Sequence, residues 1–141
     1  MIRQASLAVL LSLCLLAGGS LPAASAQDLV FVDVVGAPGD GDRALANALG
    51  ERLLSQGLAL SGTPAADAYE IQGLVRVSPA AGGKQNIRID WKVFGPGGAE
   101  LGVVTQEQAI RSGSLDNTWG RAAAAAAEAA AQDILKLLQR Q

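Results

Sequence analysis

The chain contains no histidine and a single cysteine, Cys14, among its 141 residues. The missing histidine excludes the usual general base of serine and cysteine hydrolases, and it removes the commonest nitrogen ligand of zinc. With one cysteine the chain cannot form an internal disulfide. These absences remove most familiar catalytic and metal sites. We therefore expect a protein without enzymatic activity, with no catalytic residue, no metal and no cofactor.

Aromatic residues make up only 4% of the chain and charged residues 17%, whereas half of the residues are hydrophobic. This balance excludes a disordered polymer, which would be poor in apolar residues and rich in net charge. Eleven basic and thirteen acidic residues leave a net charge of −2. Because no excess of positive charge is available to neutralise phosphates, general nucleic-acid binding is excluded as well. The length favours one domain.

The N-terminal segment has the pattern of a secretory signal. A short cationic start precedes an uncharged apolar run from Ala5 to Ala17. This run is shorter than the roughly 20 residues that a membrane-spanning helix needs. Ala24-Ser25-Ala26 then supplies the small residues that signal peptidase requires. We predict a signal peptide over residues 1–26, cleaved after Ala26, and one exported periplasmic domain over residues 27–141 with no transmembrane span.

A lipid anchor is the alternative for this segment. Leu11-Ser12-Leu13-Cys14 resembles a lipobox, in which the cysteine is acylated after cleavage. The residue before that cysteine is small in a lipobox, whereas here it is leucine, and the apolar run continues beyond Cys14. These features favour the cleaved, unlipidated form. An outer-membrane lipoprotein acylated at Cys14 remains the alternative prediction.

The rest of the chain alternates strand and helix patterns. Residues 29–35 form a β-branched apolar run, which predicts an inner strand buried on both faces. A helix is predicted over 40–56, with Asp40 as its N-cap and Gly57 just after its C-terminus. Residues 58–60 are consistent with a short strand.

Three strands with strict alternation follow, over residues 69–78, 87–93 and 100–110. Their period of two predicts one buried and one solvated face, and their short connections predict an antiparallel meander. An alanine-rich helix is predicted over 119–139, capped by Ser114 or Asp116.

The order β-α-β-β-β-β-α predicts an α+β two-layer sandwich, with both helices packed on one face of the sheet. Trp91 and Trp119 are the only tryptophans, and we expect both in the core. The alanines of the second helix allow close approach to the sheet, so we expect little room there for a small ligand. An exposed edge strand could pair with another copy, and the oligomeric state stays open.

The polar side of the meander is the candidate protein-interaction face. Glu70 and Asp90 could form a carboxylate pair for hydrolysis. However, three cations share their face, which favours paired and fully ionised acids over a general acid. We therefore predict a surface for docking another protein or an added strand. Its residues are Glu70, Gln72, Arg76, Arg88, Asp90 and Lys92.

The stretch from Ala66 to Gln106 runs as strand, glycine, strand, hairpin, strand, glycine-rich turn and strand. This order resembles the small α/β domain at the start of the Tol–Pal periplasmic protein TolB, and it is similar to curli-secretion, flagellar and peptidoglycan-synthase-activating lipoproteins. Val30-Phe31-Val32 and Leu45 to Leu53 match the opening strand and helix of these families. The resemblance implies an accessory protein that contacts another cell-envelope protein. A small-ligand-binding periplasmic protein is the alternative.

Overall fold

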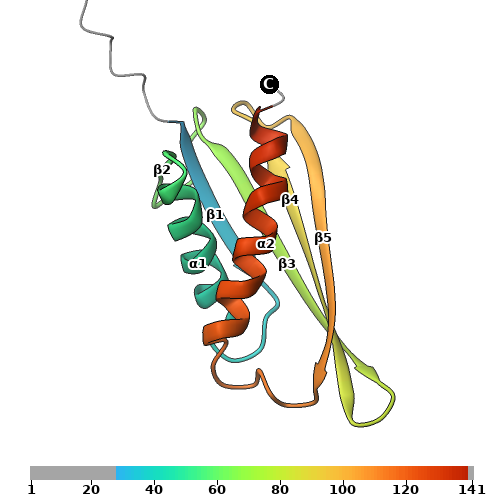
Figure 1. The fold of residues 1–141 in the computed structure, drawn as a ribbon. Helices are drawn as coiled ribbons and strands as arrows, with labels where there is room; N and C mark the ends of the chain where they lie inside the picture. The colour runs from blue at the N-terminus through green and yellow to red at the C-terminus, as the bar shows by residue number, and fades with distance from the viewer. Residues whose placement is uncertain (1–27, 140–141) are drawn as a thin grey trace, which may run out of the picture.

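A computed structural model describes residues 28–139 of the chain (Figure 1). The elements are β1 (Leu29–Val35), α1 (Gly41–Ser55), β2 (Ala59–Leu60), β3 (Tyr69–Ala80), β4 (Lys84–Phe94), β5 (Glu100–Arg111) and α2 (Gly120–Gln139). Their order and class confirm the predicted α+β sandwich. Between residues 28 and 139, no helix is both long and apolar enough to cross a membrane. The predicted signal peptide, its cleavage site and Cys14 lie outside the described residues.

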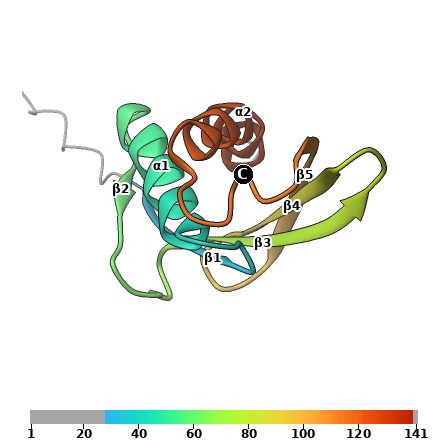
Figure 2. The ribbon, with the colours of Figure 1, turned by 90° about the horizontal axis from the view of Figure 1, so that it is seen from below.

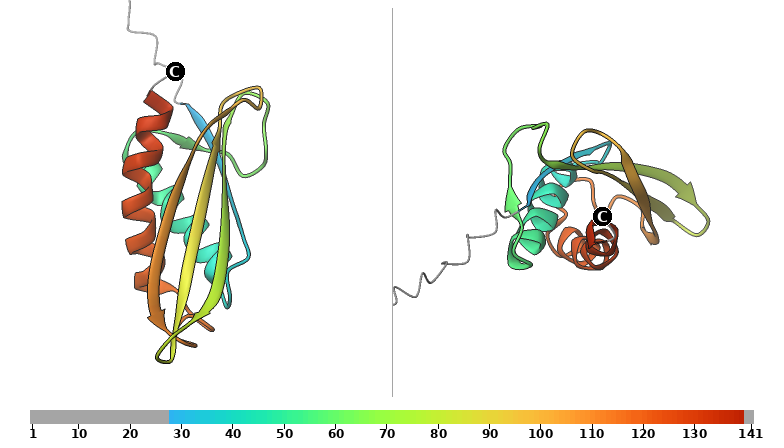
Figure 3. Two further views of the ribbon diagram at one scale, coloured as in Figure 1. Left: turned by 90° about the vertical axis from the view of Figure 1, so that its right-hand side faces the viewer. Right: turned by 90° about the horizontal axis from the view of Figure 1, so that it is seen from above.

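The five strands form one mixed sheet in the order β2-β1-β3-β4-β5. β1 runs parallel to both of its neighbours, and β3, β4 and β5 form the predicted antiparallel meander. Both helices lie against the same face of this sheet, as the end-on and side views show (Figures 2 and 3). The opposite face is covered by no helix of residues 28–139. We call it the open face.

β1 is an inner strand, but the prediction that both of its faces are buried is wrong. Val30 and Val34 are buried beneath the helices. Asp33 is exposed and Val35 keeps 50% of its surface accessible, because both point to the open face. A run of β-branched residues therefore forms a strand that is buried on one face only. Such residues favour strands even where one face of the strand is exposed to solvent.

Trp91 lies at the centre of the core, with none of its surface exposed. It stands directly opposite Gly73 of β3, where the missing side chain leaves space for the indole ring. The indole Nε1–H donates to Oε1 of Gln106 at 2.8 Å, and the amide of Gln106 donates to the carbonyl of Ala126 at 3.0 Å. This chain of hydrogen bonds links β4, β5 and α2 through the interior.

Asp40 is the N-cap residue of α1, as predicted, and its carbonyl accepts the N–H of Ala44 at 2.9 Å. Its side chain, however, makes no hydrogen bond to α1. Its Oδ1 instead accepts the backbone N–H of Trp119 at 2.9 Å, immediately before α2, and so links the two helix starts. The predicted caps of α2 are wrong, since the Ser114 hydroxyl donates to the carbonyl of Arg111 and no bond from Asp116 to α2 is present in the described residues. The indole of Trp119, buried as predicted, donates to the carbonyl of Pro38 at 2.8 Å.

The C-terminus of α1 is the one that the sequence predicts. Gly57 adopts a φ of +90°, which favours glycine, and its N–H donates to the carbonyl of Leu54 at 3.0 Å. The N–H of Leu58 donates to the carbonyl of Leu53 at 3.2 Å. This pair of bonds is a Schellman motif, which satisfies the last carbonyls and turns the chain into β2.

Candidate protein-interaction surface

All six predicted site residues lie on the open face, on the adjacent strands β3 and β4. In the observed register Gln72 stands opposite Lys92, and Arg76 stands opposite Arg88. The prediction that the six residues share one face of the sheet is therefore confirmed. β3 supplies Glu70, Gln72 and Arg76, and β4 supplies Arg88, Asp90 and Lys92.

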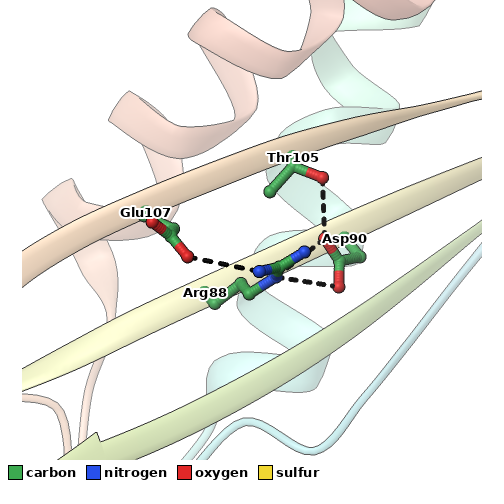
Figure 4. Close-up of polar contacts among 4 residues, drawn as sticks. All are labelled: Arg88, Asp90, Thr105 and Glu107. Atoms are coloured by element: carbon green, nitrogen blue, oxygen red, sulfur yellow. Dashed lines mark hydrogen bonds and ion pairs between the residues drawn. The ribbon is translucent and has the colours of Figure 1, made fainter.

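Arg88 is the centre of a polar cluster on this face (Figure 4). Its Nε lies 3.2 Å from both carboxylate oxygens of Asp90, and its Nη1 lies 3.4 Å from Oε1 of Glu107. The hydroxyl of Thr105 donates to Oδ1 of Asp90 at 2.8 Å. Sequence reasoning missed Thr105 and Glu107, although both belong to the face. They are found only from the β4–β5 register, which sets Thr105 opposite Asp90 and Glu107 opposite Arg88.

The hydrogen bond from Thr105 and the nearby guanidinium of Arg88 lower the pKa of Asp90 below its ordinary value of 3.8, although partial burial acts in the opposite direction. A carboxyl whose pKa falls on folding stabilises the fold above its unfolded pKa, and this contribution disappears as the pH drops through the folded pKa. Asp90 is therefore ionised at neutral pH and unsuited to general-acid catalysis.

We expect Asp90→Asn to lower the free energy of unfolding by about 1 kcal/mol at pH 7, the usual contribution of hydrogen bonds to a charged group. The difference from the unmodified protein should shrink as the pH falls below 3.8 and through the lowered pKa of folded Asp90, because the carboxylate is then lost from both states. Urea titrations followed by circular dichroism at neutral and at acidic pH measure this difference. Asp33→Asn, on the exposed side of β1, is the control. An Asp90→Asn difference that grew in acid would contradict the assignment.

The remaining charges of the face are free to meet a partner. Within residues 28–139, Arg76 and Lys92 make no ion pair, and Glu70 accepts a hydrogen bond from the amide of Gln72 at 2.8 Å. Arg76 also stands opposite Arg88, and like charges in that position disfavour each other. Both arginines line a hollow of about 380 Å³, together with Ser78, Asn86 and Glu107.

The structure does not assemble the acids of this face into a hydrolytic pair. Glu70 stands opposite Phe94, four residues along β4 from Asp90. This spacing corresponds to about 13 Å of strand, so the two acids are not cross-strand neighbours. Asp90 is moreover turned toward Arg88. In the described part of the chain, no three acidic side chains gather in a way that could hold a metal ion.

A second feature lies on the other side of the sheet, where α2 faces β4 and β5. A groove of about 370 Å³ runs between Ile87, Ile89 and Ile110 on the strands and an alanine side of α2. The prediction that alanines leave little room for a ligand is wrong. Short side chains at Ala122, Ala125, Ala126 and Ala129 leave space that larger ones would fill.

No protein-family model matches this chain, and no curated protein is significantly similar to it in sequence. Solved structures share its shape. A PelC dodecamer from Paraburkholderia phytofirmans superposes with a TM-score of 0.52 at 16% identity, covering 79% of this chain and 88% of that chain. This likeness shows a common fold.

Two further solved proteins overlap less well. A minor lipoprotein from Acinetobacter baumannii has a TM-score of 0.49 at 14% identity, covering 80% of this chain and 94% of that one. Rare lipoprotein B from Shewanella oneidensis has a TM-score of 0.41 at 13% identity, covering 80% and 92%.

Proposed function

We propose that this chain is an exported, non-enzymatic accessory protein of the bacterial cell envelope, and that it docks another envelope protein through the open face of its sheet. The observation that carries the docking step is the unpaired positive charge of this face. Arg76 and Lys92 extend from adjacent strands without a carboxylate partner in the described residues. An acidic partner would gain ion pairs there without displacing existing ones.

Export and envelope location rest on the N-terminal pattern and on the resemblance to TolB-type and lipoprotein domains. The signal-like segment before Gln27 directs the chain out of the cytoplasm. An accessory role fits a chain without histidine, whose acids on the open face are separated or ion-paired. Acylation at Cys14 would change the anchoring of the protein without changing its docking face.

We expect the double reversal Arg76→Glu/Lys92→Glu to abolish cross-links between the open face and its partner, because these are the two cations of the face that have no carboxylate partner in the described residues. A photoreactive amino acid at Gln72, which is exposed between these cations and Glu70, reports the contact in cells of the source organism. The reversal places negative charge opposite an acidic partner, and such juxtaposition costs several kcal/mol. Mass spectrometry of the cross-linked species is the measurement.

The matched control is Arg43→Glu/Lys136→Glu, which makes the same charge change on the exposed sides of α1 and α2. It should leave the cross-links at Gln72 intact. Equal cross-linking in both variants would refute docking through the open face, provided that circular dichroism shows both to be folded.

The groove beneath α2 supports the alternative function, a binder of small apolar ligands. Its volume of about 370 Å³ lies within the roughly 300 to 1,000 Å³ of typical ligand sites. Its wall combines isoleucine and alanine side chains with the amides of Gln106 and Gln108. Reversal of Arg76 and Lys92, neither of which borders the groove, would leave such binding unchanged, so the same variant separates the two functions.

A further inference from the structure

β5 is an edge strand with a long row of main-chain groups directed away from the sheet. The N–H of Ser112 donates to the carbonyl of Gly83 at 3.0 Å, so the main-chain groups of Ser112 point toward the strand that precedes β5. In an antiparallel pair the direction of the hydrogen bonds alternates from residue to residue. The outward-directed N–H and C=O groups are therefore those of Val103, Thr105, Glu107 and Ala109, followed by the N–H of Arg111. The carbonyl of Arg111 already accepts the N–H and the hydroxyl of Ser114.

This edge has little of the usual protection against pairing with another strand. Natural sheets protect their edges with proline, charged side chains and above all lysine, bulges or very short strands. Between Val103 and Arg111 there is no proline, no lysine and no shift of register. The charged residues of this stretch are Glu107 and Arg111, which are of opposite sign. The other edge strand, β2, has only two residues. Of the two edges of this sheet, β5 is the one available for strand addition.

We propose that β5 pairs with β5 of a second copy of this chain, antiparallel and about a twofold axis at Ala109, so that the two sheets become one. This inference is independent of the proposed docking through the open face. The partner is a copy of the same chain, and the contact is the main-chain edge of the sheet.

The charges of β5 favour this register over the other antiparallel pairings of the two strands. With the axis at Ala109, Glu107 of each copy stands opposite Arg111 of the second copy, giving two opposite-charge pairs. An axis at Glu107 sets the two Glu107 side chains against each other. Axes at Thr105, Gln106 or Gln108 bring Glu107 opposite an uncharged side chain. The register at Ala109 is therefore the favoured one.

The side chains around the axis also suit a close contact. Ala109 is the smallest side chain that β5 presents on the open face, so it allows the strands to approach. On the helix side, Ile110 borders the apolar groove and would lie beside Gln108 of the second copy. About four main-chain hydrogen bonds form between positions 107 and 111, two between the Ala109 residues and one from each Arg111 N–H to the carbonyl of Glu107 in the second copy. The contact is smaller than the roughly 1,200 Å² of tight complexes, so we expect a dissociation constant in the micromolar range.

Cysteine cross-linking tests the register directly. In an antiparallel hydrogen-bonded pair, Cα atoms lie about 5.5 Å apart, within the range that a disulfide spans. In the full chain carrying Cys14→Ser, Ala109→Cys should give a covalent dimer under mild oxidation. Val103→Cys, on the same edge but far from the axis, is the matched control and should stay monomeric. Equal rates for the two variants, or a faster reaction of Glu107→Cys, would overturn the proposal.

A charge exchange tests the same contact without cysteines. Sedimentation equilibrium should show dimers of the unmodified chain weakened about tenfold by Arg111→Glu and also by Glu107→Arg. The double exchange rebuilds both pairs with reversed signs, but it also removes the contact of Glu107 with Arg88 of its own chain. It should therefore recover part of the lost affinity. Arg121→Glu on α2 makes the same charge change away from the edge and should have no effect. A monomeric unmodified chain at about 500 µM, or no recovery in a folded double variant, would refute the pairing.

Loss of self-association and loss of docking are distinguishable. Ala109→Cys reports only on the β5 edge, whereas Arg76→Glu/Lys92→Glu changes two cations of the open face and leaves the ion pair between Arg88 and Glu107 in place. A chain that cross-links at Ala109 but contacts no envelope protein would retain the dimer and disprove the proposed function, and the converse holds equally.

Discussion

Replacing Trp91 by alanine is expected to lower the free energy of unfolding by about 4 kcal/mol. The indole is fully buried and fills the space above Gly73, so truncation removes apolar contacts and leaves a cavity. It also leaves the side-chain oxygen of Gln106 without its donor inside the protein. Because domains of this size have total stabilities of about 5 to 15 kcal/mol, this single change removes a large part of the total.

Urea unfolding followed by far-UV circular dichroism measures this loss. Trp91→Phe keeps most of the ring but loses the N–H donor, so it should cost about 1 to 2 kcal/mol and provides a result if the alanine variant does not fold. The control is Val103→Ala on β5, where the side chain is 47% exposed and the cost should stay below about 1 kcal/mol. A Trp91→Ala cost no greater than that of Val103→Ala would show that the indole does not organise the core.

Alanine at Gly41 should destabilise the protein by about 2 kcal/mol, although alanine is the better helix former. A Cβ atom at this first residue of α1 would lie 2.5 Å from Cε2 and Nε1 of Trp119, and equally close to the Cβ of Ala37. The indole cannot move aside freely, because it is bonded to Pro38 while the Trp119 backbone is bonded to Asp40. The steric clash therefore outweighs the gain of roughly 1 kcal/mol in helix propensity.

Gly50→Ala is the matched comparison within the same helix. Its Cβ would meet only the flexible end of Leu60, a side chain that is 40% exposed. We expect this variant to be neutral or more stable by up to about 1 kcal/mol. Thermal or urea unfolding of both variants gives the comparison. Equal effects at the two glycines would argue against close packing of the α1 start on Trp119.

The strand periods and helix patterns predicted much of this architecture. Alternation in residues 69–78 and 87–93 correctly separated the residues under the helices from those on the open face, because successive side chains of a strand point to opposite sides. The same rule placed all six candidate residues together. It failed for β1, whose apolar run suggested two buried faces although Asp33 and Val35 reach solvent.

By itself, then, the sequence determined the class of the fold, the order of its elements and the side of the sheet on which each polar residue lies. These properties follow from local periods of 2 and 3.6 residues, which need no knowledge of the neighbouring strand or helix. Only the tertiary structure decided that Thr105 and Glu107 join Arg88, that Asp40 bonds to a backbone 79 residues away, and that a groove opens under α2. Strand register and helix packing bring these distant residues together, and both depend on how the whole chain fills its core.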